Sequence, residues 1–223
     1  MATTPIELFW ISGSPFSWRV MLTLEAKQIP YTSRLLQALK GEHKNPDFLA
    51  LNPRGKVPTL RDCDFVLSES LAIMQYLDVK YASNPMFGRT ARDTAVIWRA
   101  ISAFLSYLQL PIIRISGPLN FGKSEEKAGD IRAAQPEVHA ELEKLEAALA
   151  HNAWLAGEGM TAADATVYPF LKILLRVVGK EEARPFDLGL LPLGSRYPRL
   201  AAWMDQMEQL PGYQRTYPPH WRP

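Results

Sequence analysis

The sequence contains a single cysteine, Cys63, among its 223 residues. One cysteine excludes an internal disulfide framework and any cysteine-rich metal site. The four histidines, His43, His139, His151 and His220, show no spacing typical of metal ligands, which argues against a catalytic zinc site. We therefore expect a protein without a bound metal, working in a reducing compartment.

The chain also lacks an excess of either charge. Lysine and arginine number 25 against 23 aspartates and glutamates, so the formal net charge is +2. The residues before Pro85 include 9 basic and 8 acidic side chains, and the remainder includes 16 and 15. Because neither half is polarised, we expect neither a nucleic acid nor an anionic membrane as a partner.

Long apolar runs and targeting signals are missing as well. No stretch approaches the roughly 18 uninterrupted apolar residues that a membrane span needs. Residues 1–5 (MATTP) lack the basic and apolar regions of a signal peptide. Hydrophobic residues make up 47% and charged residues 22% of the chain, as in ordinary globular proteins. These features predict a soluble cytoplasmic protein of one large or two small domains.

Residues 1–83 have the pattern of a small α/β domain. Residues 6–10 alternate as a strand does, a helix follows to about Lys27, and residues 31–36 predict a second strand. Pro15 suits the first position of that helix, and Ser14 suits the N-cap before it. The order strand–helix–strand favours a parallel pair with a crossover helix.

The rest of this domain predicts two short strands and a helix. The strands are expected at residues 57–61 and 65–67, joined by a tight turn that contains Cys63. Residues 68–70 (SES) open the helix, which has apolar residues on one face. The order is therefore β-α-β and then β-β-α, which predicts one small sheet with helices packed on it.

The second part of the chain is predicted to be helical. Residues 84–89 form a linker, and residues 90–223 contain no convincing strand. Residues 94–115 are long and apolar, and we expect a kink at Pro111. Residues 161–164 (TAAD) form a capping-box variant before an apolar helix, which gives Asp164 a structural role. Residues 217–223 are irregular and are expected only to cover surface.

Three segments of the first domain carry a resemblance when they are taken together: residues 14–20 (SPFSWRV), 52–60 (NPRGKVPTL) and 68–70 (SES). In this order and spacing they resemble the glutathione-binding domain of the cytosolic glutathione transferases. The implied fold class is an α/β thioredoxin-like N-terminal domain (βαβ-ββα) followed by an all-α helical C-terminal domain. The Ser-x-x-Ser-x-Arg-Val form is most similar to the serine-type (tau, zeta and theta-like) branches.

The chemistry of the first segment concerns a thiolate. A thiol becomes a good nucleophile only when hydrogen-bond donors and positive potential lower its pKa. Ser14 lies where a strand gives way to a helix, and a helix start favours an anion. The resemblance implies that Ser14 donates a hydrogen bond to the glutathione sulfur and that Arg19 adds positive potential. Ser14 is otherwise an ordinary N-cap. Ser12 and Ser17 are lesser candidates for the same role, and Ser17 is expected on the helix surface.

The other two segments are implied to bind the rest of glutathione. The resemblance implies a cis peptide bond before Pro58 and a backbone pairing of Val57 with the cysteinyl part of the tripeptide. A carboxylate at Glu69, together with the hydroxyl and N–H of Ser70, suits the charged head group of the γ-glutamyl end. Positive charges then remain for the glycyl carboxylate. The residues that provide them are Lys44, in a loop, and Lys56, which follows the family pattern closely.

The resemblance implies a second, electrophilic substrate as well as glutathione, the co-substrate. Phe16 and Tyr107 are the candidate apolar walls for a small hydrophobic electrophile, although Tyr107 also fits a helical core. The family also implies a cytoplasmic homodimer that acts in detoxification. Two alternatives stay open. One is glutathione-dependent isomerisation like that of the zeta branch, which isomerises maleylacetoacetate, and the other is a non-catalytic binding or interaction protein on the same scaffold.

Overall fold

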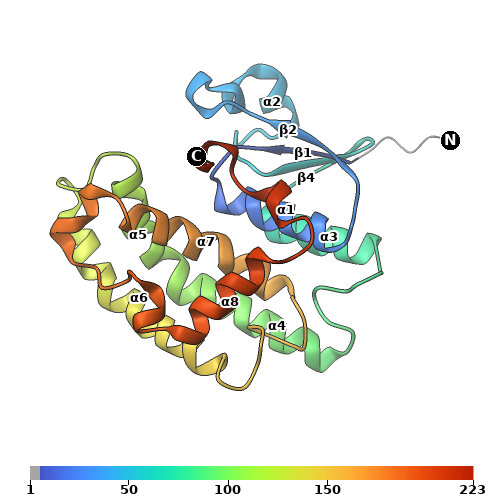
Figure 1. The fold of residues 1–223 in the computed structure, drawn as a ribbon. Helices are drawn as coiled ribbons and strands as arrows, with labels where there is room; N and C mark the ends of the chain where they lie inside the picture. Colours follow the sequence, from blue (N-terminus) through green and yellow to red (C-terminus); the bar gives the residue numbers. More distant parts are fainter. Residues whose placement is uncertain (1–5, 223) are drawn as a thin grey trace. The chain divides into compact units, whose positions relative to one another are not determined.

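A computed structural model describes residues 6–222 of the protein; residues 1–5, in which the sequence shows no signal-peptide features, lie outside the described residues. The chain divides into two compact units. The first contains residues up to Met86 together with those from Leu210 onward, and the second is Phe87–Gln209. Figure 1 labels α1 to α8 and strands β1, β2 and β4 of the two units.

The first unit is built on a four-stranded sheet in the order β2-β1-β3-β4. The strands are β1 (Ile6–Trp10), β2 (Tyr31–Leu35), β3 (Thr59–Asp62) and β4 (Phe65–Ser68). β1 pairs in parallel with β2, and the β1–β3 and β3–β4 pairs are antiparallel. This topology confirms the predicted β-α-β and β-β-α order. Cys63 occupies the exposed β3–β4 turn, where it was expected.

Helices cover both faces of this sheet. α1 (Pro15–Ala26) and α3 (Ser70–Lys80) lie against one face, and the short α2 (Pro46–Leu51) lies on the other side (Figure 1). The alternation of β1 explains the arrangement, because Leu8 is completely buried and Phe9 points the opposite way, toward Phe48 of α2, with 5.9 Å between their ring centres. Between β2 and β3, where the sequence predicted only a loop at Lys44, the chain forms α2 and two 3-10 turns (Ala38–Lys40 and Glu42–Lys44).

The second unit is helical, and between Phe87 and Gln209 it has no strand. Its helices are α4 (Ala91–Ala103), α5 (Gln109–Asn120), α6 (Ala128–Ala148), α7 (Ala162–Val178) and α8 (Pro198–Glu208), with 3-10 turns at Glu181–Phe186 and Leu193–Ser195. This confirms the predicted all-α architecture of the second part. The residues buried on these helices include Val138, Leu171 and Trp203.

A continuous helical run, Ala91–Asn120, joins α4 to α5. The helix continues through Pro111, where the sequence predicted a kink, and residues Phe104–Leu108 form a π-helical segment just before this proline. Proline lacks an N–H and its ring clashes with the carbonyl four residues earlier, so a wider turn accommodates it. By length and mean hydropathy (1.5) this run could cross a membrane. Polar residues interrupt the run, so it does not stand out in the sequence as an uninterrupted apolar stretch. Ile101 and Ile112 of this run are fully buried in the unit, and 33% of its most apolar window is buried.

The first unit also contains the end of the chain. The sequence-predicted helical region extended from residue 90 to residue 223, whereas α9 (Tyr213–Thr216) and the 3-10 turn Pro219–Trp221 belong with the sheet and α1. The physical reason is Trp18 of α1, whose indole N–H donates to the Thr216 hydroxyl at 2.8 Å. Trp18 is 2% exposed, so the end of the chain helps to bury a large aromatic side chain that the sheet does not cover.

Candidate functional site

Ser14 caps the N-terminus of α1, as the sequence predicted. Its backbone is extended and its hydroxyl oxygen accepts a hydrogen bond from the Ser17 N–H at 3.3 Å. Pro15 occupies the first helical position. Because the Ser14 oxygen is the acceptor in this bond, the hydroxyl proton remains able to donate to another group. The side chain is half-buried, so an external molecule can reach it.

The two neighbouring serines are less suited to hold an external anion. Ser17 is completely buried and its hydroxyl has no hydrogen-bond partner, so the expectation that it lies on the helix surface is wrong. It faces inward because α1 is enclosed from Ser17 to Leu24. The Ser12 hydroxyl is hydrogen-bonded to the His220 ring at Nδ1, 2.6 Å away. Ser14 is therefore the candidate best placed to donate to a bound group.

Arg19 lies one turn into α1 and is 2% exposed. Its guanidinium carbon is 4.9 Å from the centre of the Phe16 ring, within cation–π range. Burial lowers the pKa of Arg19 to about 10, and the negative charge of Glu69 opposes that shift. The group therefore stays cationic at neutral pH. The effect of the Glu69 charge on the Arg19 pKa indicates an electrostatic interaction between α1 and the start of α3. The sequence alone did not predict this interaction.

Glu69 and Ser70 begin α3 with an unusual backbone. Glu69 has φ +71° and ψ 106° at the N-cap position, and it is exposed, whereas Ser70 is buried as the first helical residue. A positive φ in a residue other than glycine costs on the order of 1 kcal/mol, and such strain is concentrated at functional sites. The backbone thus holds the Glu69 carboxylate outside the helix.

The loop before β3 presents an unpaired length of backbone. The Val57–Pro58 peptide bond is cis, as the resemblance implied. Within the described residues, the N–H and C=O of Val57 form no hydrogen bond, although the neighbouring Lys56 carbonyl accepts from the Asn52 amide at 2.8 Å and from Thr59 at 3.2 Å. Val57 therefore offers one donor and one acceptor to an added extended peptide.

The two candidate lysines lie at the same loop. Lys56 is exposed. The Lys44 ammonium donates to the carbonyls of Gly55 at 3.0 Å and Arg54 at 3.4 Å. Lys44 therefore stabilises the loop that leads to Val57, and its charge lies close to that loop.

The two candidate walls of the electrophile pocket belong to different units. Phe16 is half-buried beside Arg19 on α1. Tyr107 is 62% exposed on the π-helical segment, with the Lys144 ammonium 5.9 Å from its ring centre. Because Tyr107 is exposed, it does not belong to the hydrophobic core of the helical unit. The role of Tyr107 as a contact for the electrophile remains a prediction. Within residues 6–222, no group of three or more metal-ligating side chains is found.

Comparison with known protein families decides the family. A model described as glutathione S-transferase, N-terminal domain, matches residues 13–80, and a model of the C-terminal domain of the same family matches residues 100–211. The chain belongs to the glutathione S-transferase family. The first match contains all three segments of the resemblance, which confirms both the predicted family and the predicted fold class.

Individual relatives of this glutathione S-transferase extend over almost the whole chain. Glutathione S-transferase 3 of maize is 33% identical, over 95% of this chain and 93% of its own. Glutathione S-transferase Z1 of Arabidopsis thaliana is 30% identical, over 96% and 91%. Among solved structures, a glutathione S-transferase from the Antarctic clam Laternula elliptica superposes with a TM-score of 0.83 at 28% identity, covering 98% of this chain and 94% of the other.

Proposed function

We propose that this glutathione S-transferase converts the thiol of bound glutathione to a thiolate with the help of Ser14. The observation that carries the proposal is the state of the Ser14 side chain, a half-buried N-cap whose hydroxyl donates no hydrogen bond to any of residues 6–222. A donor at this position would stabilise the negative sulfur more than the neutral thiol, and so would lower the thiol pKa. The thiol proton leaves to solvent.

The tripeptide is proposed to bind along one edge of the first unit. The unpaired N–H and C=O of Val57 pair with the cysteinyl backbone in the manner of an added strand. Glu69 binds the α-ammonium group of the γ-glutamyl end, and Ser70 binds its carboxylate at the start of α3. Lys44 and Lys56 face the glycyl carboxylate, which needs a positive charge but no fixed geometry.

Arg19 is proposed to act on the sulfur from inside the unit. Its buried cation lies one turn behind Ser14, where the surrounding protein screens the charge less than water does. The same charge attracts the Glu69 carboxylate, and this attraction opposes the effect of burial on the Arg19 pKa. Arg19 therefore links the part of the site that ionises the thiol to the part that binds the γ-glutamyl group.

The reaction that follows is nucleophilic transfer. The thiolate sulfur forms a bond to an electrophilic carbon of a small hydrophobic substrate, and the leaving group departs with its electron pair. Phe16 and Tyr107 are the proposed apolar contacts for that substrate. Rate comes from the lowered thiol pKa and from holding both reactants together. Detoxification of such electrophiles in the cytoplasm is the physiological role that fits this chemistry.

A glutathione-dependent isomerase is the second candidate. It is favoured by the zeta-type relative from Arabidopsis thaliana, which is 30% identical over nearly the full length. Isomerisation begins with the same attack of the thiolate, which adds to a conjugated double bond and moves its electron pair onto the adjoining carbonyl group. Rotation about the resulting single bond follows, and the thiolate leaves as the double bond forms again. Pro15 and Phe16 stand where the zeta motif has serine and cysteine, so we rank general transfer first.

Binding and a substrate panel test the proposed function. We expect the protein to bind glutathione, measured by titration calorimetry, and to consume it in the presence of aryl halides and activated alkenes. Scoring conjugation, isomerisation and halide release separately will distinguish transfer from isomerase activity. A folded protein that does not bind glutathione would support the alternative of a non-catalytic interaction protein.

Replacing Glu69 with glutamine is expected to weaken glutathione binding. Glutamine keeps the shape but loses the charge that pairs with the α-ammonium group, so KM for glutathione should rise by roughly tenfold, the effect of one charged hydrogen bond in a solvated site. The kcat should stay within about twofold, because the thiol is elsewhere. Asp64→Asn is the matched control, since it removes an exposed carboxylate in the β3–β4 turn. Equal KM values for the two variants would remove Glu69 from the site.

The family also implies a homodimer, which we retain as a proposal. The sequence suggested that apolar residues near Leu71–Met74 and Trp98 contribute to the interface. Met74 is completely buried within its own unit, so it is unavailable for such a contact. Leu71 and Trp98 are partly exposed and remain candidates. Sedimentation analysis gives the oligomeric state.

A further inference from the structure

The end of the chain is attached along α1 by aromatic contacts. The Trp18 ring of α1 lies 5.9 Å from Tyr217 and 5.5 Å from Trp221, both edge-on. Its indole N–H donates to the Thr216 hydroxyl, which itself donates to the Tyr213 carbonyl at 2.8 Å. Residues 210–222, which we call the C-terminal segment, are therefore held against the first turn of α1.

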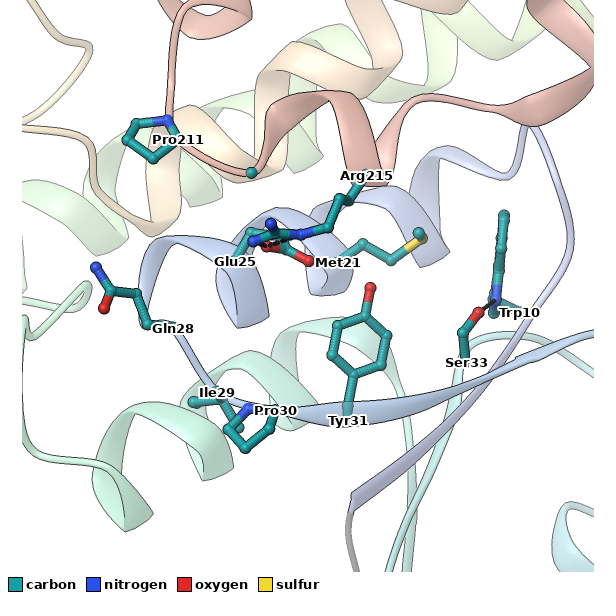
Figure 2. A pocket seen from close by; sticks show the side chains of 11 residues that line it. Trp10, Met21, Glu25, Gln28, Ile29, Pro30, Tyr31, Ser33, Pro211 and Arg215 are labelled. Atoms are coloured by element: carbon teal, nitrogen blue, oxygen red, sulfur yellow. Dashed lines mark hydrogen bonds and ion pairs between the residues drawn. The ribbon is translucent and has the colours of Figure 1, made fainter.

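A second attachment lies at the carboxyl end of the same helix. Figure 2 shows Arg215 of the C-terminal segment pointing to Glu25 of α1, and the Arg215 Nε donates to the carboxylate at 2.9 Å. This ion pair borders a pocket of about 710 Å³ between α1, β2 and the C-terminal segment, into which the Tyr31 hydroxyl points. Burial is the main cause that raises the pKa of Tyr31 to about 12, so its hydroxyl stays neutral.

The first of these attachments, at Trp18, brings His220 to the turn before Ser14. The Ser14 N–H donates to the Ile11 carbonyl at 3.1 Å, which closes a four-residue turn over residues 11–14. Gly13 has φ +82°, the conformation that the third position of a type II turn requires. Ser12, in the second position, is hydrogen-bonded to His220 Nδ1 at 2.6 Å. His220 therefore contacts the turn that leads into Ser14.

Gly13 leaves room for this contact. A Cβ atom at Gly13 would lie 2.9 Å from His220 Cε1, closer than real contacts allow. Glycine at this position therefore allows the positive φ of the turn and also allows the imidazole of His220 to approach the backbone closely. The predicted role of residues 217–223, surface cover alone, does not account for this contact.

We propose that His220 is a positioning residue for the thiol chemistry. Through Ser12 it fixes the turn over residues 11–14, and so holds the Ser14 hydroxyl in the orientation that stabilises the thiolate. The proposal rests on the proposed function of Ser14. It also explains why Ser12 does not take that role itself, since its hydroxyl is engaged by the imidazole.

The test compares two amides at position 220. Asparagine places a polar atom where histidine has Nδ1, and glutamine places it where histidine has Nε2. We expect His220→Asn to keep kcat at saturating glutathione within about twofold, and His220→Gln and His220→Ala to lower it roughly fivefold, the effect of one neutral hydrogen bond. The two defective variants should also raise the pKa of the bound thiol, read from thiolate absorbance. Ser12→Ala should match His220→Ala, and the double variant should be no worse than either.

Control variants separate positioning from attachment of the chain end. Arg215→Gln loosens the C-terminal segment at Glu25, far along α1 from Ser14, and should lower the melting temperature without changing the thiol pKa. An unchanged kcat and thiol pKa in His220→Ala, or equal defects in His220→Asn and His220→Gln, would overturn the proposal. If these variants are normal while Ser14→Ala is inactive, only the role of His220 fails. If Ser14→Ala is fully active, the proposed function fails and the role of His220 fails with it.

Discussion

Ser14→Ala is expected to lower turnover about a hundredfold at saturating glutathione. The variant loses one hydrogen bond to a charged sulfur, which contributes about 1.5–3 kcal/mol, and loss of a single donor to an anionic centre has effects of about 10²–10³ in kcat. Glutathione binding should change by less than about threefold, because the peptide contacts at Val57 and Glu69 remain. Steady-state kinetics with glutathione and an aryl halide measure both effects.

Two further serine variants control this experiment. Ser14→Thr keeps the hydroxyl and the N-cap, so it should recover much of the activity that alanine loses. Ser17→Ala removes a buried hydroxyl without a partner, so turnover should be unchanged. Ser14→Ala also loses the cap of α1, and a decrease of about 1 kcal/mol in the free energy of unfolding is expected. Full turnover in Ser14→Ala would remove the residue from the mechanism.

Asp164→Ala is expected to destabilise the helical unit by roughly 4 kcal/mol. The Asp164 carboxylate is fully buried and accepts four hydrogen bonds, from the N–H groups of Leu155 and Thr161, the Thr161 hydroxyl and the Trp203 indole, all at 2.8–2.9 Å. Alanine leaves these buried donors without an acceptor, at about 1–3 kcal/mol each before relaxation. Denaturant unfolding followed by tryptophan fluorescence measures the loss.

The chain provides a matched control for Asp164. Thr90 and Asp93 form the same capping box at the start of α4, but Asp93 is exposed. Water can replace its contacts, so Asp93→Ala should destabilise the protein much less than Asp164→Ala does. Similar losses in the two variants would show that the buried network around Asp164 contributes no more than a surface cap.

The candidate site could be predicted from the sequence where its signals are local. Ser14 followed by Pro15 marks a helix start, and residues 57–58 and 68–70 lie at the ends of predicted elements. Each of these positions depends on neighbours within a few residues. The structure accordingly places Ser14 at the N-cap of α1 and Ser70 at the first position of α3.

The remaining features depend on contacts between distant parts of the chain. Ser17 is buried and Arg19 is coupled to Glu69 because of how α1 packs, which helical spacing does not specify. His220 meets Ser12 although 208 positions separate them, and no periodic pattern in residues 217–223 indicates this contact. The sequence offers one indication of this packing: Trp18 is a large aromatic residue on a short helix, so another part of the chain is needed to bury it.

The pKa of the bound thiol tests the central claim most directly. The thiolate absorbs in the ultraviolet, so a pH titration of the glutathione complex gives this pKa for the native protein and for Ser14→Ala. We predict a value clearly below the ~8.5 of a free cysteine thiol in the native complex, and a value higher by about 1 to 2 in the variant, equivalent to one charged hydrogen bond. The same thiol pKa in both complexes would contradict the claim that the tip of α1 ionises glutathione through Ser14.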